Sequence, residues 1–196
     1  MRLWGWLMAI WGRSATPVSA AARFWRRERG AWWPWREGTL PRVGGTRLAP
    51  VGTLVLATQS PGAALPLRFG YALVEPGPTG WTVTQACWSI VLQPGPLIFD
   101  CAPLWQGGEN RVLVFGYVAE PQVRSIEVRF ANGSASQDVP TNGLFAVVGP
   151  VFDADQQLTS DIVHEVCGLD GAGRIVQCLT FDQIARRSMA RLQSSR

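Results

Sequence analysis

The alternation of apolar and polar positions is clearest in the middle of the chain. From Ile126 to Phe130 every second residue is apolar, and the residues between them are the charged Glu127 and Arg129. A period of two is typical of a strand with one buried face. Asn132-Gly133 follows at once, and both residue types accept the positive φ that a two-residue hairpin turn requires. The pattern predicts a β-hairpin here.

Similar apolar segments continue on both sides of this hairpin, separated by Pro- and Gly-rich breakers such as 60–62, 76–78 and 94–96. Strand signals at this spacing, with no helical pattern between them, predict an all-β fold and specifically an antiparallel β-sandwich over residues 49–182. The predicted strands cover residues 51–58, 65–74, 81–92, 97–102, 112–118, 123–130, 135–139, 144–148, 162–169 and 174–181. The residues expected in or near the core are Ile126, Val128, Phe130, Phe145, Val147, Trp81 and Trp88.

The period changes to that of a helix at the C-terminal end. Thr180 and Gln183 have the spacing of a capping box, and the apolar residues from Phe181 to Leu192 fall on one helical face. Residues 183–196 are therefore predicted to form a short amphipathic helix. It either closes the open end of the sandwich or presents its arginines to a membrane or a partner.

The N-terminal residues 1–22 have the layout of a secretory signal peptide. Arg2 precedes a short apolar run, and Val18 and Ala20 fit the −3 and −1 positions of a cleavage site. The apolar run is about half as long as a transmembrane span, which argues against an integral helix. Arg13 and the Trp and Gly residues inside the run are less typical of a signal sequence.

Residues 23–48 mix tryptophan with arginine. Gly30 and Pro34 exclude a long regular helix. Three interpretations stay open: a disordered basic linker, sequence upstream of the true start, or a membrane-surface contact, since indole rings and guanidinium groups suit anionic headgroups. The fold prediction treats this N-terminal segment as non-globular. The candidate membrane-contact residues are Trp25, Arg26, Arg27, Trp32, Trp33 and Trp35.

The net charge of +4 conceals an uneven distribution. Residues 1–47 carry nine Arg and two Glu, residues 48–185 carry five Arg and twelve acids, and residues 186–196 carry four Arg. The β-rich part is thus acidic between two basic ends, which argues against nucleic-acid binding by this domain. All 18 basic residues are Arg, as in proteins encoded by GC-rich genomes.

The four cysteines form two pairs, each flanking a predicted turn. Cys87 and Cys101 lie on either side of 94–96, and Cys167 and Cys178 on either side of 170–173. Each pair is placed to form a cross-strand disulfide, which predicts an oxidising compartment. Other connectivities, and four reduced thiols, stay open. Zinc is disfavoured because no pair has C-x₂-C spacing.

Few residues suggest catalysis or metal binding. His164 is the sole histidine, so a Ser-His or Cys-His hydrolase would depend on it, but its neighbours alternate as in a strand. Asp153, Asp155 and Asp161 have the odd spacing of calcium-loop ligands, yet Leu158 stands where such loops need glycine. A solvated acidic loop is the preferred interpretation. No glycine loop for phosphate is present, and no cofactor is expected.

A recurrent order of motifs runs from residue 112 to residue 180. It consists of Phe115-Gly116-Tyr117-Val118, Val123-Arg124-Ser125-Ile126-Glu127-Val128, Asn132-Gly133, Gly143-Leu144-Phe145-Ala146-Val147 and Leu169-Asp170-Gly171-Ala172-Gly173-Arg174-Ile175-Val176. This order resembles the Ig-like β-sandwich modules of uncharacterised secreted or membrane-anchored proteins from GC-rich bacteria. The resemblance implies an Ig-like sandwich with an extracytoplasmic, non-catalytic role, and it carries over no catalytic residues. The Trp/Arg segment departs from it.

The leading hypothesis is therefore an extracytoplasmic binding or structural module that recognises a protein or cell-surface ligand. A membrane-surface protein acting through residues 23–48, and a hydrolase using His164, are the alternatives.

Overall fold

The computed structural model describes residues 16–28, 42–49, 52–59, 68–90, 95–106, 108–153, 162–180 and 182–183. Within these residues the protein is almost entirely antiparallel β-sheet, which confirms the all-β prediction. Three sheets are present. The N-terminal sheet has the order β1-β2-β3-β4, the central sheet β5-β6-β9 and the outer sheet β11-β10-β7-β8.

The strands agree closely with the predicted segments from residue 52 onward. The N-terminal sheet contains β1 (Arg42–Ala49), β2 (Gly52–Gln59), β3 (Arg68–Gly77) and β4 (Gly80–Ile90). The central sheet contains β5 (Leu97–Gln106), β6 (Glu109–Val118) and β9 (Leu144–Val151). The outer sheet contains β7 (Ser125–Phe130), β8 (Ala135–Asp138), β10 (Val163–Leu169) and β11 (Ile175–Thr180).

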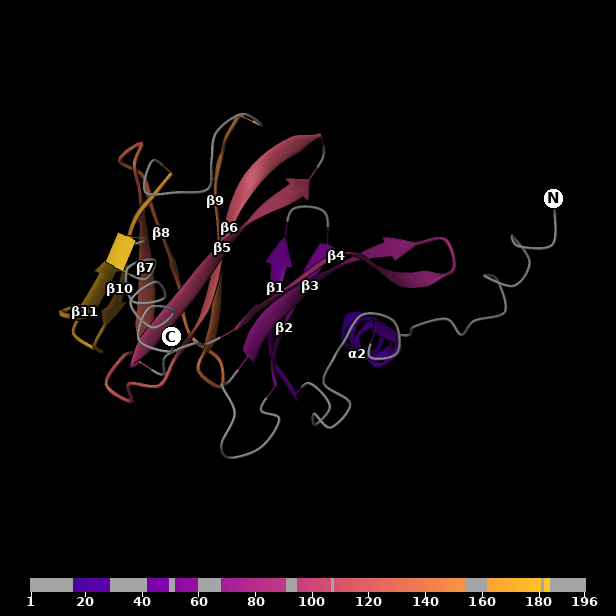
Figure 1. Ribbon diagram of the computed structural model, residues 1–196, viewed down its shortest axis with the longest axis horizontal. Helices are drawn as coiled ribbons and strands as arrows, with labels where there is room; N and C mark the ends of the chain where they lie inside the picture. The colour runs from indigo at the N-terminus through magenta and orange to yellow at the C-terminus, as the bar shows by residue number, and fades with distance from the viewer. Residues whose placement is uncertain are drawn as a thin grey trace, which may run out of the picture.

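The sheets stack in layers, and helix α2 (Pro17–Glu28) covers the far side of the N-terminal sheet. Figure 1 shows the outer sheet at the left, then the central sheet, the N-terminal sheet and α2 at the right. One apolar core fills the space between the outer and central sheets, and a second fills the space between the central and N-terminal sheets. The structure therefore contains three stacked sheets, one more than the two of the predicted sandwich.

Burial on two faces explains why some strands show no alternation in sequence. On β6, Val112 and Val114 pack into the first core, whereas Leu113 and Phe115 pack into the second. A strand that is buried on both faces must be apolar at every position. The outer sheet buries only one face, so β7 alternates between buried and half-buried residues.

The predicted core residues are confirmed. The five from β7 and β9 are buried, and Trp81 and Trp88 pack half-buried against the cluster under α2. Glycine permits the close packing at one point of the central sheet. A Cβ at Gly116 would overlap the carbonyl oxygen of Ile98 and the ring of Phe145.

The prediction of a non-globular segment over residues 23–48 is wrong for residues 23–28, which belong to one helix with residues 17–22. These residues form α2, which begins with a reciprocal cap: Ser19 N donates to Thr16 Oγ1 at 3.1 Å, and Thr16 N donates to Ser19 Oγ at 3.2 Å. Pro17 occupies the first helical position, where its missing N–H costs nothing. Ala20, Ala21 and Trp25 are buried against β2 and β3, because this face of the N-terminal sheet is apolar and needs a cover.

The predicted boundary at residue 49 is also wrong, because β1 pairs with β2 from Arg42 to Ala49. The side chains of Arg47 and Asn142 fix β1 to the rest of the molecule. Arg47 Nε donates to both carboxylate oxygens of Asp138, at 2.7 and 2.9 Å, and Asn142 Nδ2 donates to Gly44 O at 2.8 Å. Strand β1 has a low apolar content, so its place in the sheet depends on these contacts with distant residues rather than on its own pattern.

The two hairpins of the outer sheet turn through three residues rather than two. Gly133 N donates to Phe130 O at 3.0 Å, and Phe130 N donates to Ser134 O at 2.9 Å, with Gly133 at a φ of 82°. This is a type I turn followed by a glycine bulge, and Asn132 does not need positive φ in it. Asp170 and Gly173 repeat the arrangement in the second hairpin.

The predicted capping box at the C-terminal end is present. Thr180 N donates to Gln183 Oε1 at 3.0 Å, and Gln183 N donates to Thr180 Oγ1 at 3.3 Å. The rest of the predicted helix, residues 184–196, lies outside the described residues. Among the described helical residues, none forms a helix long and apolar enough to cross a membrane.

Candidate functional site

The Cys167–Cys178 disulfide, on the face of the outer sheet turned away from the core, is the chemically most distinctive feature of the described residues. Cys167 on β10 and Cys178 on the edge strand β11 are direct cross-strand partners, with a Cα–Cα distance of 4.1 Å. This confirms the predicted pairing. Cys167 is fully buried, and Cys178 on the edge strand is half-buried.

A bulge on β11 brings the two cysteines into register. Near the turn, Leu169 pairs with Ile175, but one step further Gly168 pairs with Gln177. Val176 is therefore an extra residue on β11. Without the bulge, the three-residue turn would place Cys167 opposite Gln177. The predicted cross-strand pairing of Cys167 with Cys178 is therefore reached through the bulge.

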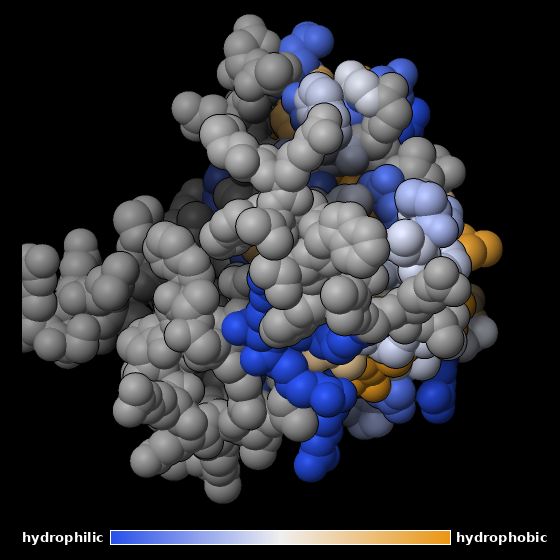
Figure 2. Space-filling model, turned by 90° about the vertical axis from the view of Figure 1, so that its right-hand side faces the viewer, coloured by the Kyte–Doolittle hydropathy of each residue, from blue (hydrophilic) through white to orange (hydrophobic). Residues whose placement is uncertain are grey.

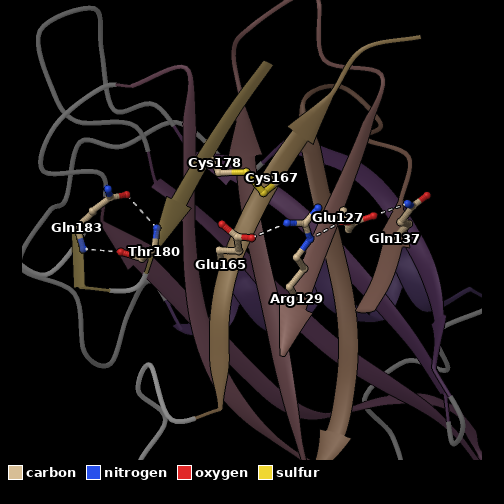
Figure 3. The surroundings of a disulfide bond; sticks show 8 residues. All are labelled: Glu127, Arg129, Gln137, Glu165, Cys167, Cys178, Thr180 and Gln183. Atoms are coloured by element: carbon tan, nitrogen blue, oxygen red, sulfur yellow. Dashed lines mark hydrogen bonds and ion pairs between the residues drawn. A yellow bond between two sulfur atoms is a disulfide. The ribbon is translucent and has the colours of Figure 1, made fainter. Parts of the chain in front are cut away.

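Charged residues continue the same face across β10 and β7. Cys167 pairs with Glu127 on β7, and Glu165 pairs with Arg129. Because side chains alternate along a strand, Glu165 and Cys167, two residues apart, point to the same side. Figure 3 shows these side chains as one row across the sheet beside the disulfide.

Arg129 links the two acids. Its Nε lies 2.6 Å from Glu127 Oε1, and its Nη1 lies 2.6 Å from Glu165 Oε1. Gln137 on β8 donates from Nε2 to Glu127 Oε2 at 2.8 Å. The four side chains thus form one continuous chain of hydrogen bonds, Gln137 to Glu127 to Arg129 to Glu165 (Figure 3).

The network shifts the titration of its members. The hydrogen bond from Gln137, followed by that from Arg129, lowers the pKa of Glu127 below its usual value. The hydrogen bonds to Glu127 and then to Glu165 raise the pKa of Arg129. Glu127 is therefore ionised, and Arg129 is charged, at neutral pH.

The lowered pKa of Glu127 predicts a pH dependence of stability. In the unfolded chain this carboxyl takes up its proton first as the pH falls, so the unfolded state binds more protons and the free energy of unfolding decreases. We expect this contribution to be complete above the unfolded pKa of 4.5 and to be lost as the pH falls through the folded value. Urea unfolding of the wild type and Glu127→Gln at several acidic pH values measures it. The variant should lose less stability on acidification, and equal losses would contradict the prediction.

Three metal-binding side chains converge at the disulfide. One donor atom each from Glu165, Cys167 and Cys178 lie within 4.8 Å of one another. As a disulfide the sulfurs form a cross-link; as thiolates they are soft metal ligands. Sequence reasoning did not identify Glu165, although its position two residues before Cys167 on an alternating strand is a usable signal.

The predicted Cys87–Cys101 disulfide is wrong, because both residues are free cysteines. They lie in different sheets: Cys87 pairs with Tyr71 and Cys101 pairs with Val114. Cys101 faces the core shared with the outer sheet, whereas Cys87 packs against the core shared with the N-terminal sheet. Strands β4 and β5, which carry these cysteines, belong to different sheets, so they do not pair as a hairpin.

Cys87 lies between the N-terminal and central sheets, near a set of hydrogen-bonded polar groups formed by Gln85, Tyr71 and Pro103. Gln85 Nε2 donates to Tyr71 Oη at 2.9 Å and also to the carbonyl oxygen of Pro103. Burial, and then the negative charge of Asp100, raise the pKa of the Cys87 thiol. Burial also raises the pKa of Tyr71. These groups are protonated at neutral pH, which disfavours Cys87 as a nucleophile.

The other predicted site residues do not converge in the described part of the chain. His164 is exposed at a bulge of β10. Asp153 is exposed after β9, and its predicted calcium co-ligands Asp155 and Asp161 lie outside the described residues. The hydrolase and calcium hypotheses therefore stay predictions.

The membrane-contact hypothesis changes most. Trp25 is 4 % exposed and packs on Trp88 at a ring-centroid distance of 5.4 Å, so the prediction that it contacts a membrane is wrong. Arg26 and Arg27 are exposed at the end of α2. Figure 2 views this side of the molecule, where strongly hydrophilic side chains form a contiguous group. Trp32, Trp33 and Trp35 lie outside the described residues.

No protein-family model, curated protein or solved structure matches the chain.

Proposed function

We propose that the chain is an extracytoplasmic, non-catalytic module that binds a protein or cell-surface ligand or serves a structural role. The observation that carries this proposal is the Cys167–Cys178 cross-link between β10 and β11. Disulfides form and persist in oxidising compartments and are rare in the cytosol. The cross-link joins β10 to the edge strand β11 and so stabilises this edge of the outer sheet.

An Ig-like sandwich belongs to the same proposal. The central and outer sheets contain the last seven strands, in the orders β5-β6-β9 and β8-β7-β10-β11. The chain crosses between these sheets after β6, β8 and β9, as in a Greek key. Seven antiparallel strands in two sheets with such crossings are characteristic of Ig-like modules. The N-terminal sheet and α2 are then additions to that module.

The mass and thiol content of the protein from its native host test the location. We expect a chain beginning at Ala21, with Cys87 and Cys101 as the two thiols that react in the unfolded, unreduced protein, and with two more after reduction. Such a chain lacks Pro17–Ala20, the first turn of α2, and keeps the buried Ala21 and Trp25 of the remaining turns. In intact cells the protein should also react with a label that cannot cross the membrane, because the proposal places the protein outside the cytoplasm.

A chain that keeps Met1, labels at all four cysteines without reduction and fractionates with the cytoplasm would overturn the proposal. The same preparation provides a control for oxidation during lysis, because alkylation before the cells are opened traps thiols in their cellular state.

A further inference from the structure

We propose that, in the reduced chain, Glu165, Cys167 and Cys178 form a binding site for Zn²⁺, and that the disulfide is the closed, metal-free form of this site. The inference does not depend on the proposed function, since it concerns what the same cysteines do before the bond forms or after it is broken.

The geometry suits a tetrahedral cation. The three donor atoms lie within 4.8 Å of one another. A tetrahedral Zn²⁺ with bonds of about 2.3 Å to sulfur and 2.1 Å to oxygen needs its donors roughly 3.6–3.8 Å apart. After the S–S bond is broken, the sulfurs need only to separate by side-chain rotation, and the Glu165 carboxylate has to approach by about an ångström or less. Direct cross-strand pairing keeps both cysteines on one face during this change.

The surroundings hold Glu165 in place for such a role. The ion pair with Arg129 engages Oε1, and the second oxygen of the carboxylate, Oε2, can bind a cation at the same time. Arg129 is itself held by Glu127, and Glu127 by Gln137. Groups that hydrogen-bond to a ligand in this way orient it and raise metal affinity.

The charge of the three ligands and the partial exposure of two of them also suit Zn²⁺ binding. Two thiolates and the carboxylates of Glu165 and Glu127 carry four negative charges, and Zn²⁺ and Arg129 together supply three positive charges that offset most of them. Two soft thiolate ligands favour Zn²⁺ over Ca²⁺ or Mg²⁺. Cys167 is fully buried, whereas Cys178 and Glu165 are half-buried, so a cation and its fourth ligand, a water molecule, can enter from the β11 side.

The conversion between the two forms balances with a dithiol reductant. Thiolate attack on the disulfide transfers two electrons and, with two protons, yields two thiols in the chain and one disulfide in the reductant. Zn²⁺ then replaces the two thiol protons, which are released to solvent. Re-oxidation by a disulfide such as oxidised glutathione passes the two electrons to that disulfide, which takes up two protons and leaves as two thiols; the Cys167–Cys178 bond re-forms and the cation is released.

Zinc titration of the full chain tests the site. The protein is reduced with a phosphine, exchanged into anaerobic buffer and titrated with Zn²⁺ against a chromophoric chelator; Co²⁺ reports thiolate ligation by its charge-transfer absorption. We expect one Zn²⁺ per reduced chain and none per oxidised chain. Glu165→Gln should weaken binding at least about tenfold, and Cys167→Ser/Cys178→Ser should abolish it.

Two controls separate the site from other effects. Glu109→Gln changes an exposed acid elsewhere and should leave zinc affinity unchanged. The double serine variant retains Cys87 and Cys101, so it measures zinc bound by these thiols. The proposal is overturned if reduced wild type binds no more zinc than this variant, or if Glu165→Gln binds as tightly as wild type.

A second measurement needs no substitution. Bound Zn²⁺ should slow re-formation of the Cys167–Cys178 disulfide by oxidised glutathione, measured by mass after acid quenching. Equal rates with and without Zn²⁺ would count against the site even if a variant failed to fold. Neither result changes the prediction for the cellular location of the oxidised protein.

Discussion

Replacing Trp25 with alanine is expected to lower the free energy of unfolding by about 3–5 kcal/mol. The side chain is 4 % exposed and packs against Trp88 and the apolar face of the N-terminal sheet. A 12-residue helix is marginal in isolation, so without this anchor α2 should leave the sheet and expose Val55 and Val74. Urea unfolding measures the loss of stability, and hydrogen exchange of the α2 amides measures the detachment.

Two matched variants make the result specific. Trp105 is 59 % exposed, and Trp105→Ala should change stability by no more than about 0.5 kcal/mol. Among the described residues, none accepts a hydrogen bond from Trp25 Nε1, so Trp25→Phe should cost much less than Trp25→Ala. Rapid exchange of the α2 amides in the wild type, or equal stability of the wild type and Trp25→Ala, would contradict the docked helix.

Loss of the disulfide is expected to have the next largest effect. The sequence separation of Cys167 and Cys178 is 11 residues, and closing a loop of this length in the unfolded chain corresponds to about 3 kcal/mol. Cys167→Ala/Cys178→Ala should therefore lower the free energy of unfolding of the oxidised protein by about that amount. The measurement is urea unfolding with and without a reductant.

The reductant distinguishes the cross-link from simple packing. It should destabilise the wild type but not the double variant, because only the wild type has a bond to lose. Cys87→Ala provides the control: it removes a free thiol but keeps the Cys167–Cys178 bond, so the reductant should destabilise it as much as the wild type. A reductant that leaves wild-type stability unchanged would show that this cross-link does not restrain the unfolded chain.

The strands were predictable because their signal is local. The alternation from Ile126 to Phe130 identified β7 as a strand of a sheet with one open face. The uninterrupted apolar run of β6 also indicated burial on two faces. The N-terminal sheet is the third sheet, and it covers the second face of β6. The Cys167–Cys178 pair was also predictable, since both residues belong to one hairpin.

The N-terminal elements were not predictable from the same reasoning. Strand β1 contains Gly44 and Gly45, and Arg47 holds it through Asp138, 91 residues away. Helix α2 has three arginines in its second half, and Trp25 among them suggested a membrane surface until its partner Trp88 was known. The capping pattern of Thr16 and Pro17 is the one local signal of the helix start.

The candidate site likewise has one part that the sequence predicts and one part that only the tertiary structure reveals. The sequence by itself determined the strands from residue 52 onward, the positions of the outer-sheet turns and the placing of Cys167 and Cys178 on facing strands of one hairpin, because contacts between neighbours along the chain decide these features. Only the tertiary structure separated Cys87 from Cys101, stacked three sheets and brought Arg129 to Glu165, because these depend on which sheet each strand joins. That choice is made by the burial of whole faces, which the pattern of a single strand does not encode.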